Sequence, residues 1–421
     1  MSMRILLALI LFFVTPVLQA QTDTYLADLT ALKSILQKTP SYKAQIKGDN
    51  LAYYTNLFNR LSADSLNHTS DYQYFYHLSQ LVFPLRDNHI GFHQVTDYKH
   101  FQNKETIEYF ITTKAFLDYP RININIDSLK ITLEKRPANS IEGIYHYDKF
   151  YSVGLFKNSD KEYIGVVVDS DINLWQVGQM AMYLYEYQPN VYKAIYGHPL
   201  TKSFILQPVE KYRNQSLVNS YFYTSYSPAI YSKDIQQVDH VNLPRDASKF
   251  AFKNINSTTQ YLRIRSFQLN RATVLESGHF YDSIKNALTA PNLILDLRNN
   301  EGGSKKASKN YYKLVKKYSK RGQVYVLLNN GTLSRAEIFT LQLNKLKNVT
   351  TLGQTTKGML TYGSNYGKRE KLPSGKFEVY PTDMKGSANL LQYEDKGIDP
   401  DIFLNSNSDW IDQVVSIMKN K

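Results

Sequence analysis

The chain has 421 residues, of which 43% are hydrophobic and 21% charged, so two or three folded domains are expected rather than one small domain or a disordered chain. There is no Cys, which excludes disulfides, a Cys nucleophile and Cys-ligated metal sites. The formal net charge is +13, but the basic residues look scattered among acids. Without a zinc-finger, RNA-binding aromatic or basic-helix motif, we expect no nucleic-acid partner.

The first twenty residues have the pattern of a secretory signal peptide. Arg4 precedes an apolar run from residue 5 to 14, Pro16 breaks that run, and Ala20 offers a small residue before a cleavage site. The run is too short for a comfortable membrane span. We expect a signal peptide over residues 1–20 and an exported mature chain without a membrane span. The alternative is an uncleaved anchor, because Leu18 is large for its position before the site.

Residues 21–88 are expected to form an N-terminal helical cap, because apolar residues recur there at helical spacing. Three such stripes lie between residues 22 and 85, and Pro40 and Pro84 close the first and third.

Residues 89–254 are expected to form a β-rich middle module. The short runs "RININI", "IEGIYHY", "YSVGLFK" and "YIGVVV" are separated by turn signals, and "LFKNSDKEYIGVVV" predicts a hairpin with its loop at residues 158–160. The glycine-rich carboxylate-binding loop of PDZ domains is not visible in this segment.

From residue 255 to 421 strands alternate with helices, which predicts a layered αβ sheet. The buried strand "NLILDL" runs through "RNNEGG" into a helix that begins near Ser304, and "QVYVLLN" leads through a turn into a helix that begins near Ser334. We therefore expect an α/β, multidomain (α+β) protein with a helical cap, a β-rich module and this αβ core.

Ser334 admits two interpretations. The sequence Ser-Arg-Ala-Glu is a capping box, so Ser334 is predicted to cap the helix. A Ser at a strand-to-helix turn also lies where backbone N–H groups and the helix dipole favour negative charge, as a nucleophile requires. The capping role does not exclude the nucleophilic one.

A Ser nucleophile needs a base, and "LRDNHIGFH" offers His89, two residues after Asp87. A lone His is more often structural. His89 and His93 lack the Glu of a zinc-protease helix, so we expect no metal. The glycines of "RNNEGG" favour either a flexible turn or backbone N–H groups that approach a substrate oxyanion.

In this order, the motifs resemble those of the C-terminal processing, or tail-specific, serine peptidases. "LILDLRNNEGG" is similar to that family's strand and Gly-Gly loop, "VYVLLNNGTLSRAEIF" to its nucleophile segment, "LGQTTKGM" to the following strand and loop, and "GIDPDIFL" to its closing signature. The resemblance is strong over residues 260–405, weaker over 22–95, and fades between them. It implies a crotonase-like peptidase core.

The resemblance also implies roles for individual residues. Met359 stands where the Ser–Lys branch of the family carries its Lys, so the chain resembles the tricorn-type branch, which uses Ser, His and a carboxylate. Transferred to this sequence, the catalytic residues are Ser334 as nucleophile, His89 as base and Glu394 as the group that orients the His. The backbone N–H groups of Gly303 and Arg335 would form the oxyanion hole.

Asp395 and Asp399 are rivals to Glu394, and the Asp87 spacing suits a turn or a substrate contact better than an orienting role. The implied function is an exported serine peptidase acting on peptides or unfolded protein tails, without metal or organic cofactor. The alternative is a non-catalytic ligand carrier on the same fold. Oligomeric state does not follow from the sequence.

Overall fold

The computed structural model describes residues 24–64, 70–236, 238–364 and 367–419. The chain divides into two compact units: unit 1 comprises Met1–Ile235 with Ser364–Met384, and unit 2 comprises Gln236–Gly363 with Lys385–Lys421. This division differs from the three segments expected from the sequence, because the helices and the β-rich module share one unit. The expected signal peptide lies outside the described residues.

Unit 1 begins with the helices that the apolar stripes predicted. Residues 24–38 are helical, and three further helices follow: α2 (Pro40–Gln45), α3 (Asp49–Ala63) and α4 (Asp71–Gln80). Side-chain caps define two of the starts, since Thr39 accepts a hydrogen bond from Tyr42 N–H and Ser70 accepts one from Gln73 N–H.

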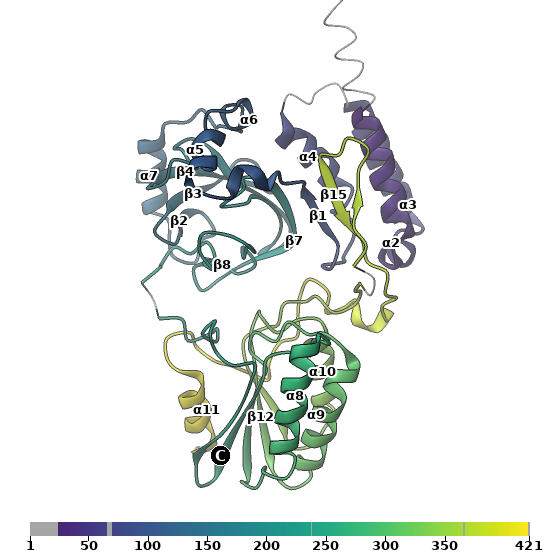
Figure 1. Ribbon diagram of the computed structural model, residues 1–421, viewed down its shortest axis with the longest axis vertical. Helices are drawn as coiled ribbons and strands as arrows, with labels where there is room; N and C mark the ends of the chain where they lie inside the picture. The colour runs from purple at the N-terminus through teal and green to yellow at the C-terminus, as the bar shows by residue number, and fades with distance from the viewer. Residues whose placement is uncertain (1–23, 65–69, 237, 365–366, 420–421) are drawn as a thin grey trace, which may run out of the picture. The chain divides into compact units, whose positions relative to one another are not determined.

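The sheet of unit 1 has ten strands, and every strand pair in it is antiparallel. Its order is β14-β15-β1-β7-β6-β5-β4-β3-β2, with β8 on β7. Figure 1 shows β15, from late in the chain, beside β1, where His93 pairs with Glu378. The strands are β1 (Gly91–Gln94), β2 (Gly143–Tyr147), β3 (Tyr151–Lys157), β4 (Glu162–Ser170), β5 (Met180–Gln188), β6 (Val191–Gly197), β7 (Phe204–Arg213), β8 (Ser216–Leu217), β14 (Glu370–Lys371) and β15 (Phe377–Tyr380).

Strands β3 and β4 form the predicted hairpin, but the segment "RININI" is not a strand. Asn125 instead caps a helix, because its side chain accepts a hydrogen bond from Ser128 N–H. The middle module therefore contains helical turns that its sequence pattern did not predict: η2 (Tyr98–Phe101), α5 (Lys104–Phe110), α6 (Lys114–Leu117) and α7 (Ile126–Glu134).

Unit 2 is the layered αβ structure that the sequence predicted. Its six-stranded sheet has the order β16-β13-β12-β11-β10-β9, parallel except for the β9–β10 pair. Its elements are β9 (Phe250–Asn256), β10 (Thr259–Ile264), α8 (Arg271–Ile284), β11 (Asn292–Asp296), α9 (Lys305–Tyr318), β12 (Gln323–Leu328), α10 (Arg335–Leu343), β13 (Val349–Gly353), η3 (Ala388–Leu390), β16 (Ile402–Phe403) and α11 (Trp410–Lys419).

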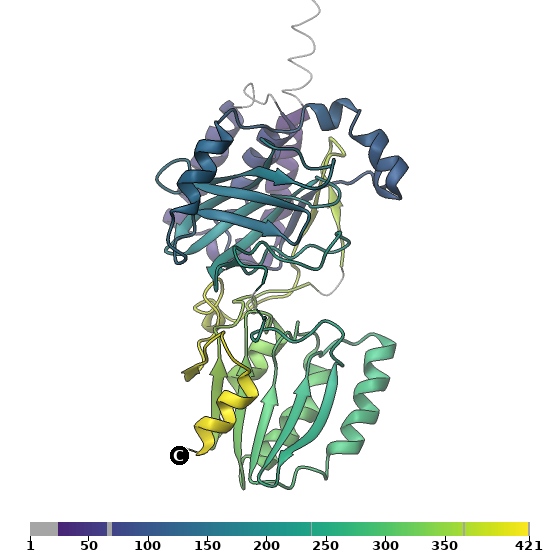
Figure 2. The same ribbon diagram turned by 90° about the vertical axis from the view of Figure 1, so that its left-hand side faces the viewer.

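Both faces of this sheet are covered. Leu293 and Leu295 of β11 pack on the side of α8, α9 and α10, whereas Ile294 packs with Trp410 of α11 on the other side (Figure 2). A strand buried on both faces reads as a continuous apolar run, which is why "NLILDL" was recognisable. Among the described residues, no helix combines the length and apolarity that a membrane crossing needs.

Candidate active site

The loop that follows β11 is held in place by its own side chains. Asn300 donates from Nδ2 to Ile264 O at 2.8 Å and accepts the Gly302 N–H at 2.9 Å. Gly302 and Gly303 both have positive φ, at 82° and 127°. The two glycines are therefore set in one conformation by a buried Asn, and the alternative of a merely flexible turn does not describe them.

Close packing explains why both positions are glycine. A Cβ on Gly302 would lie 2.7 Å from Arg335 N and 3.0 Å from Ser334 Cβ. A Cβ on Gly303 would lie 2.2 Å from Phe267 O. The loop thus presses against the start of α10 on one side and the Phe267 backbone on the other, which brings the "RNNEGG" and "GTLSRAE" motifs together.

Ser334 lies at the N-cap of α10, as the sequence predicted, and its backbone has φ 57° and ψ −118°. A non-glycine residue with positive φ is strained, and such strain is concentrated at functional sites. Leu333 N–H, one residue earlier, donates to Asn300 O at 3.0 Å. The turn that carries Ser334 is therefore bonded directly to the glycine loop.

The side chain of Glu337 holds the turn that carries Ser334. It is fully buried, and its carboxylate accepts the Ser334 N–H at 2.9 Å, the Thr356 hydroxyl at 2.6 Å, and the N–H groups of Gly358 and Met359 at 2.7 and 3.0 Å. Burial raises the pKa of Glu337, and these donors oppose the shift. The capping box pointed to Glu337, but its role in holding the 356–359 loop was not predictable from it.

The two predicted oxyanion donors are the backbone N–H groups of Gly303 and Arg335, both in unit 2, where the glycine loop packs against the start of α10. The Arg335 guanidinium is engaged elsewhere: it donates to Ser308 Oγ at 2.8 Å and to Gln342 Oε1 at 3.2 Å. Burial lowers the pKa of Arg335. The Arg335 side chain is thus held by residues of α9 and α10, and the assignment of its backbone N–H to an oxyanion hole stays a prediction.

Glu394 is fully buried in unit 2 and is also held by backbone donors. Its Oε2 accepts the N–H groups of Leu360 at 3.0 Å and Thr361 at 2.9 Å. The rival Asp399 accepts from Thr355 Oγ1 at 2.6 Å, in an exposed pair. These contacts favour Glu394 over Asp399 as the buried carboxylate of the site, while Asp395, next in the chain, is equally buried.

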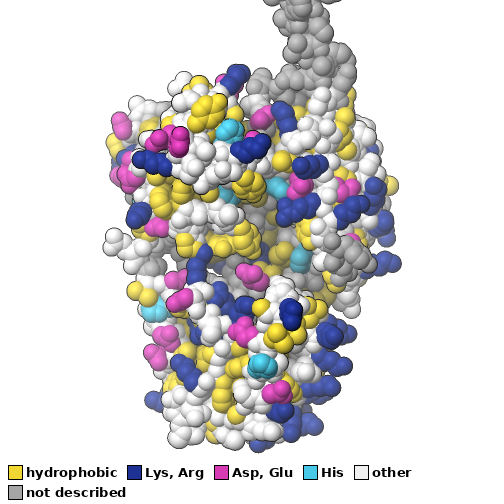
Figure 3. Space-filling view, viewed as in Figure 1, with side chains coloured by type: hydrophobic (Ala, Val, Ile, Leu, Met, Phe, Trp, Pro, Cys, Tyr) yellow, Lys and Arg dark blue, Asp and Glu magenta, His cyan; other side chains and the backbone are white. Residues whose placement is uncertain are grey.

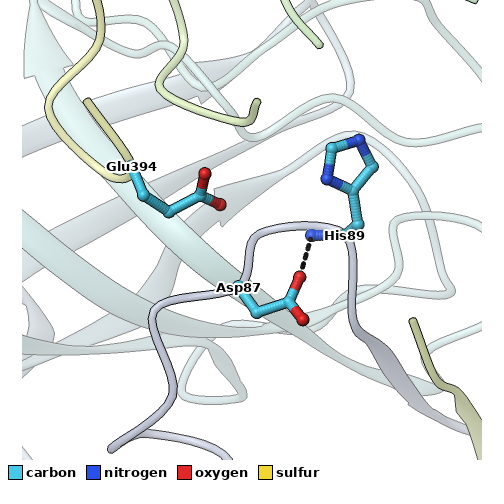
Figure 4. A group of neighbouring side chains, drawn as sticks. All are labelled: Asp87, His89 and Glu394. Carbon is cyan, nitrogen blue, oxygen red and sulfur yellow. Dashed lines mark hydrogen bonds between the residues drawn. The ribbon is translucent and has the colours of Figure 1, made fainter. Parts of the chain in front are cut away.

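His89 lies in unit 1, in the turn between α4 and β1. Its N–H donates to Asp87 Oδ1 at 3.2 Å, and Thr382 Oγ1 donates to Asp87 Oδ2 at 2.6 Å (Figure 4). Burial raises the pKa of Asp87 to about 6. The expectation that Asp87 shapes a turn is confirmed by this bond. Figure 4 also shows the Glu394 side chain.

His93 has a different partner from His89. Its Nε2 lies 3.2 Å from Glu378 Oε1, across the β1–β15 pair, and burial lowers its pKa. His93 and His89 both belong to unit 1. The other predicted site residues, which are Ser334, Glu394 and the oxyanion donors, belong to unit 2.

Comparison with known proteins identifies the C-terminal part of the chain. Residues 304–404, which include Ser334 and Glu394, match the family model described as peptidase family S41. A search of curated proteins finds no significant match.

Several solved structures are similar to the chain at low identity. A putative peptidase from Parabacteroides merdae is 14% identical over 94% of this chain and 96% of its own, with a TM-score of 0.39. The photosystem II D1 C-terminal processing protease is 15% identical over 91% and 93%, with a TM-score of 0.36. A lipoprotein from Streptococcus agalactiae is 21% identical over 42% and 71%, with a TM-score of 0.30.

Proposed function

We propose that the chain is a serine peptidase of the S41 type, because residues 304–404 match the model of that family, and that it hydrolyses peptide bonds through an acyl-enzyme on Ser334. One observation carries the proposal. Ser334 stands in a strained backbone conformation at the start of α10, against a rigid glycine loop, inside the segment that matches the family. A hydroxyl held beside backbone N–H groups at a helix start suits acyl transfer.

In the proposed first step, Ser334 Oγ attacks the carbonyl carbon of the scissile bond while its proton passes to the His89 ring. The N–H groups of Gly303 and Arg335 stabilise the oxyanion. The carbon–nitrogen bond then breaks, and His89 returns the proton to the leaving amine.

In the second step, water attacks the resulting ester, gives a proton to His89, and releases the acid product with Ser334 restored. Glu394 orients the His89 ring and stabilises it when charged. The proposal requires the His89 ring to lie within hydrogen-bond reach of Ser334 Oγ in the reacting complex.

The choice of the tricorn-type Ser/His/Glu arrangement rests on the loop after β13. Met359 occupies the position of the Lys in the alternative branch, and its N–H donates to Glu337. The substrates we propose are peptides or unfolded protein tails. We also propose that the protein is exported, on the basis of the signal pattern in residues 1–20.

Labelling with a fluorophosphonate probe tests the proposal. The wild-type chain should be labelled, and Ser334→Ala should not. Ser416→Ala, which removes an exposed hydroxyl bonded to Asp412 O in α11, is the matched control and should be labelled like the wild type. Folded wild-type protein that resists the probe and cleaves no unfolded polypeptide would favour the ligand-carrier alternative.

A further inference from the structure

Helix α9 carries a run of lysines, so the basic residues of the chain are less scattered than its sequence suggested. Between residues 305 and 320 there are seven Lys and no Asp or Glu, in a chain whose formal net charge is +13. More than half of the excess charge is therefore concentrated in one short segment. We call these residues the lysine stripe: Lys305, Lys306, Lys309, Lys313, Lys316, Lys317 and Lys320.

The stripe occupies a single face of α9. At 3.6 residues per turn its helical members fall within an arc of about 120°. The opposite face is buried in the core of unit 2 through Tyr311, Leu314, Val315 and Tyr318. All seven lysines are exposed, and Figure 3 shows dark blue side chains gathered on the side of unit 2 where α9 lies.

This arrangement works against the stability of the helix. Lys305, Lys309, Lys313 and Lys317 follow one another at intervals of four, and like charges at that spacing destabilise a helix. Lys305 and Lys306 also lie in the first turn, where the helix dipole disfavours cations. Among the described residues, no stripe lysine forms an ion pair, whereas acids of neighbouring α8 pair elsewhere: Glu276 with Lys249 and Asp282 with Lys285.

The stripe begins at the candidate active site. Gly303, a predicted oxyanion donor, is two residues before Lys305, and Arg335 is tied to Ser308 of α9 by a hydrogen bond of 2.8 Å. The 14 residues of α9 extend about 20 Å from this loop. An extended polypeptide covers that length with about six residues.

From this geometry we propose that the lysine stripe recruits unfolded polypeptides with an acidic segment about six residues or more from the scissile bond. The proposal rests on the peptidase function and names its substrate class. Lys is a flexible point charge, which suits a mobile acidic chain. The apolar face of α9 is buried in unit 2, so the helix has no apolar face to insert into a bilayer.

The test compares two versions of one unfolded reporter polypeptide, with six Glu or six Gln added at each end. For the wild type at low salt, kcat/KM should be about tenfold higher with the Glu ends, and the ratio should approach one at 0.5 M salt. The stripe variant, with Gln at 309, 313, 316 and 317, should have a ratio near one. The control, with Gln at four exposed lysines outside the stripe, should keep the wild-type ratio: Lys253, Lys345, Lys347 and Lys419.

Binding to catalytically inactive Ser334→Ala protein separates this proposal from the peptidase assignment. Fluorescence anisotropy should show that a labelled Glu-rich peptide binds Ser334→Ala and that the stripe changes in the same background weaken binding at least tenfold.

Peptide binding by a protein whose wild type is not labelled by the fluorophosphonate probe would overturn the peptidase assignment and leave the stripe proposal standing. Equal ratios for both reporters, or a ratio that survives in the stripe variant, would overturn the stripe proposal. The stripe proposal would also be overturned if the stripe variant alone lost binding to phosphatidylglycerol vesicles while the wild type showed no preference for the Glu-rich peptide.

Discussion

Glu337 Oε2 accepts the backbone N–H of Ser334 at 2.9 Å, so the acid of the capping box holds the main chain of the proposed nucleophile. The same carboxylate binds Thr356, Gly358 and Met359. Capping and catalysis are therefore compatible uses of one motif. The cap fixes the strained backbone of Ser334 and leaves its nucleophilic role to the hydroxyl.

We expect Glu337→Gln to lower the free energy of unfolding by about 1–3 kcal/mol, because an amide NH₂ would face N–H groups that need an acceptor. Urea denaturation measures this change. Glu276→Gln, at a half-exposed position in α8, is the control and should stay within about 0.5 kcal/mol of the wild type. If the two variants were equally stable, the carboxylate would not be anchoring the turn.

Two glycines in unit 2 should respond oppositely to substitution by Ala. Gly302→Ala would place Cβ 2.7 Å from Arg335 N at a φ of 82°, so a loss of about 1–3 kcal/mol and slower probe labelling are expected. Gly278 lies inside α8 with nothing within 4 Å of its Cβ position, so Gly278→Ala should gain about 0.5–1 kcal/mol. Thermal unfolding and labelling rates check both. Unimpaired labelling of Gly302→Ala would mean that the loop does not shape the site.

Local pattern was enough to predict much of unit 2. The run "NLILDL" is apolar because both faces of β11 are covered, and Ser334 follows a strand and opens a striped helix as expected. Each of these features depends on residues close together in the chain. The rigidity of the glycine loop was less evident, because it depends on contacts of Gly302 with Arg335 and of Gly303 with Phe267.

Unit 1 was harder to predict because its pairing is non-local. Strand β1 is hydrogen-bonded to β15, so Gly91 lies opposite Tyr380 almost three hundred residues later. No periodicity in either segment reports that pairing. The segment "RININI" failed for a local reason: its alternation suggested a strand, but Asn125 uses its side chain to start α7.

Asp87→Asn should change the pH dependence of unit 1 stability. Burial raises the pKa of Asp87 from 3.8 to about 6. Between these values the folded chain keeps a proton that the unfolded chain releases, so wild-type stability falls as pH rises through this window. Loss of the Thr382 bond adds an offset that does not change with pH. The free energy of unfolding of Asp87→Asn relative to the wild type should therefore rise by about 2 kcal/mol from pH 4 to 7.5. Urea denaturation at both pH values tests this, with exposed Asp127→Asn as a control expected to change by less than about 0.5 kcal/mol. A pH-independent difference for Asp87→Asn would show that its carboxyl is not destabilised by burial.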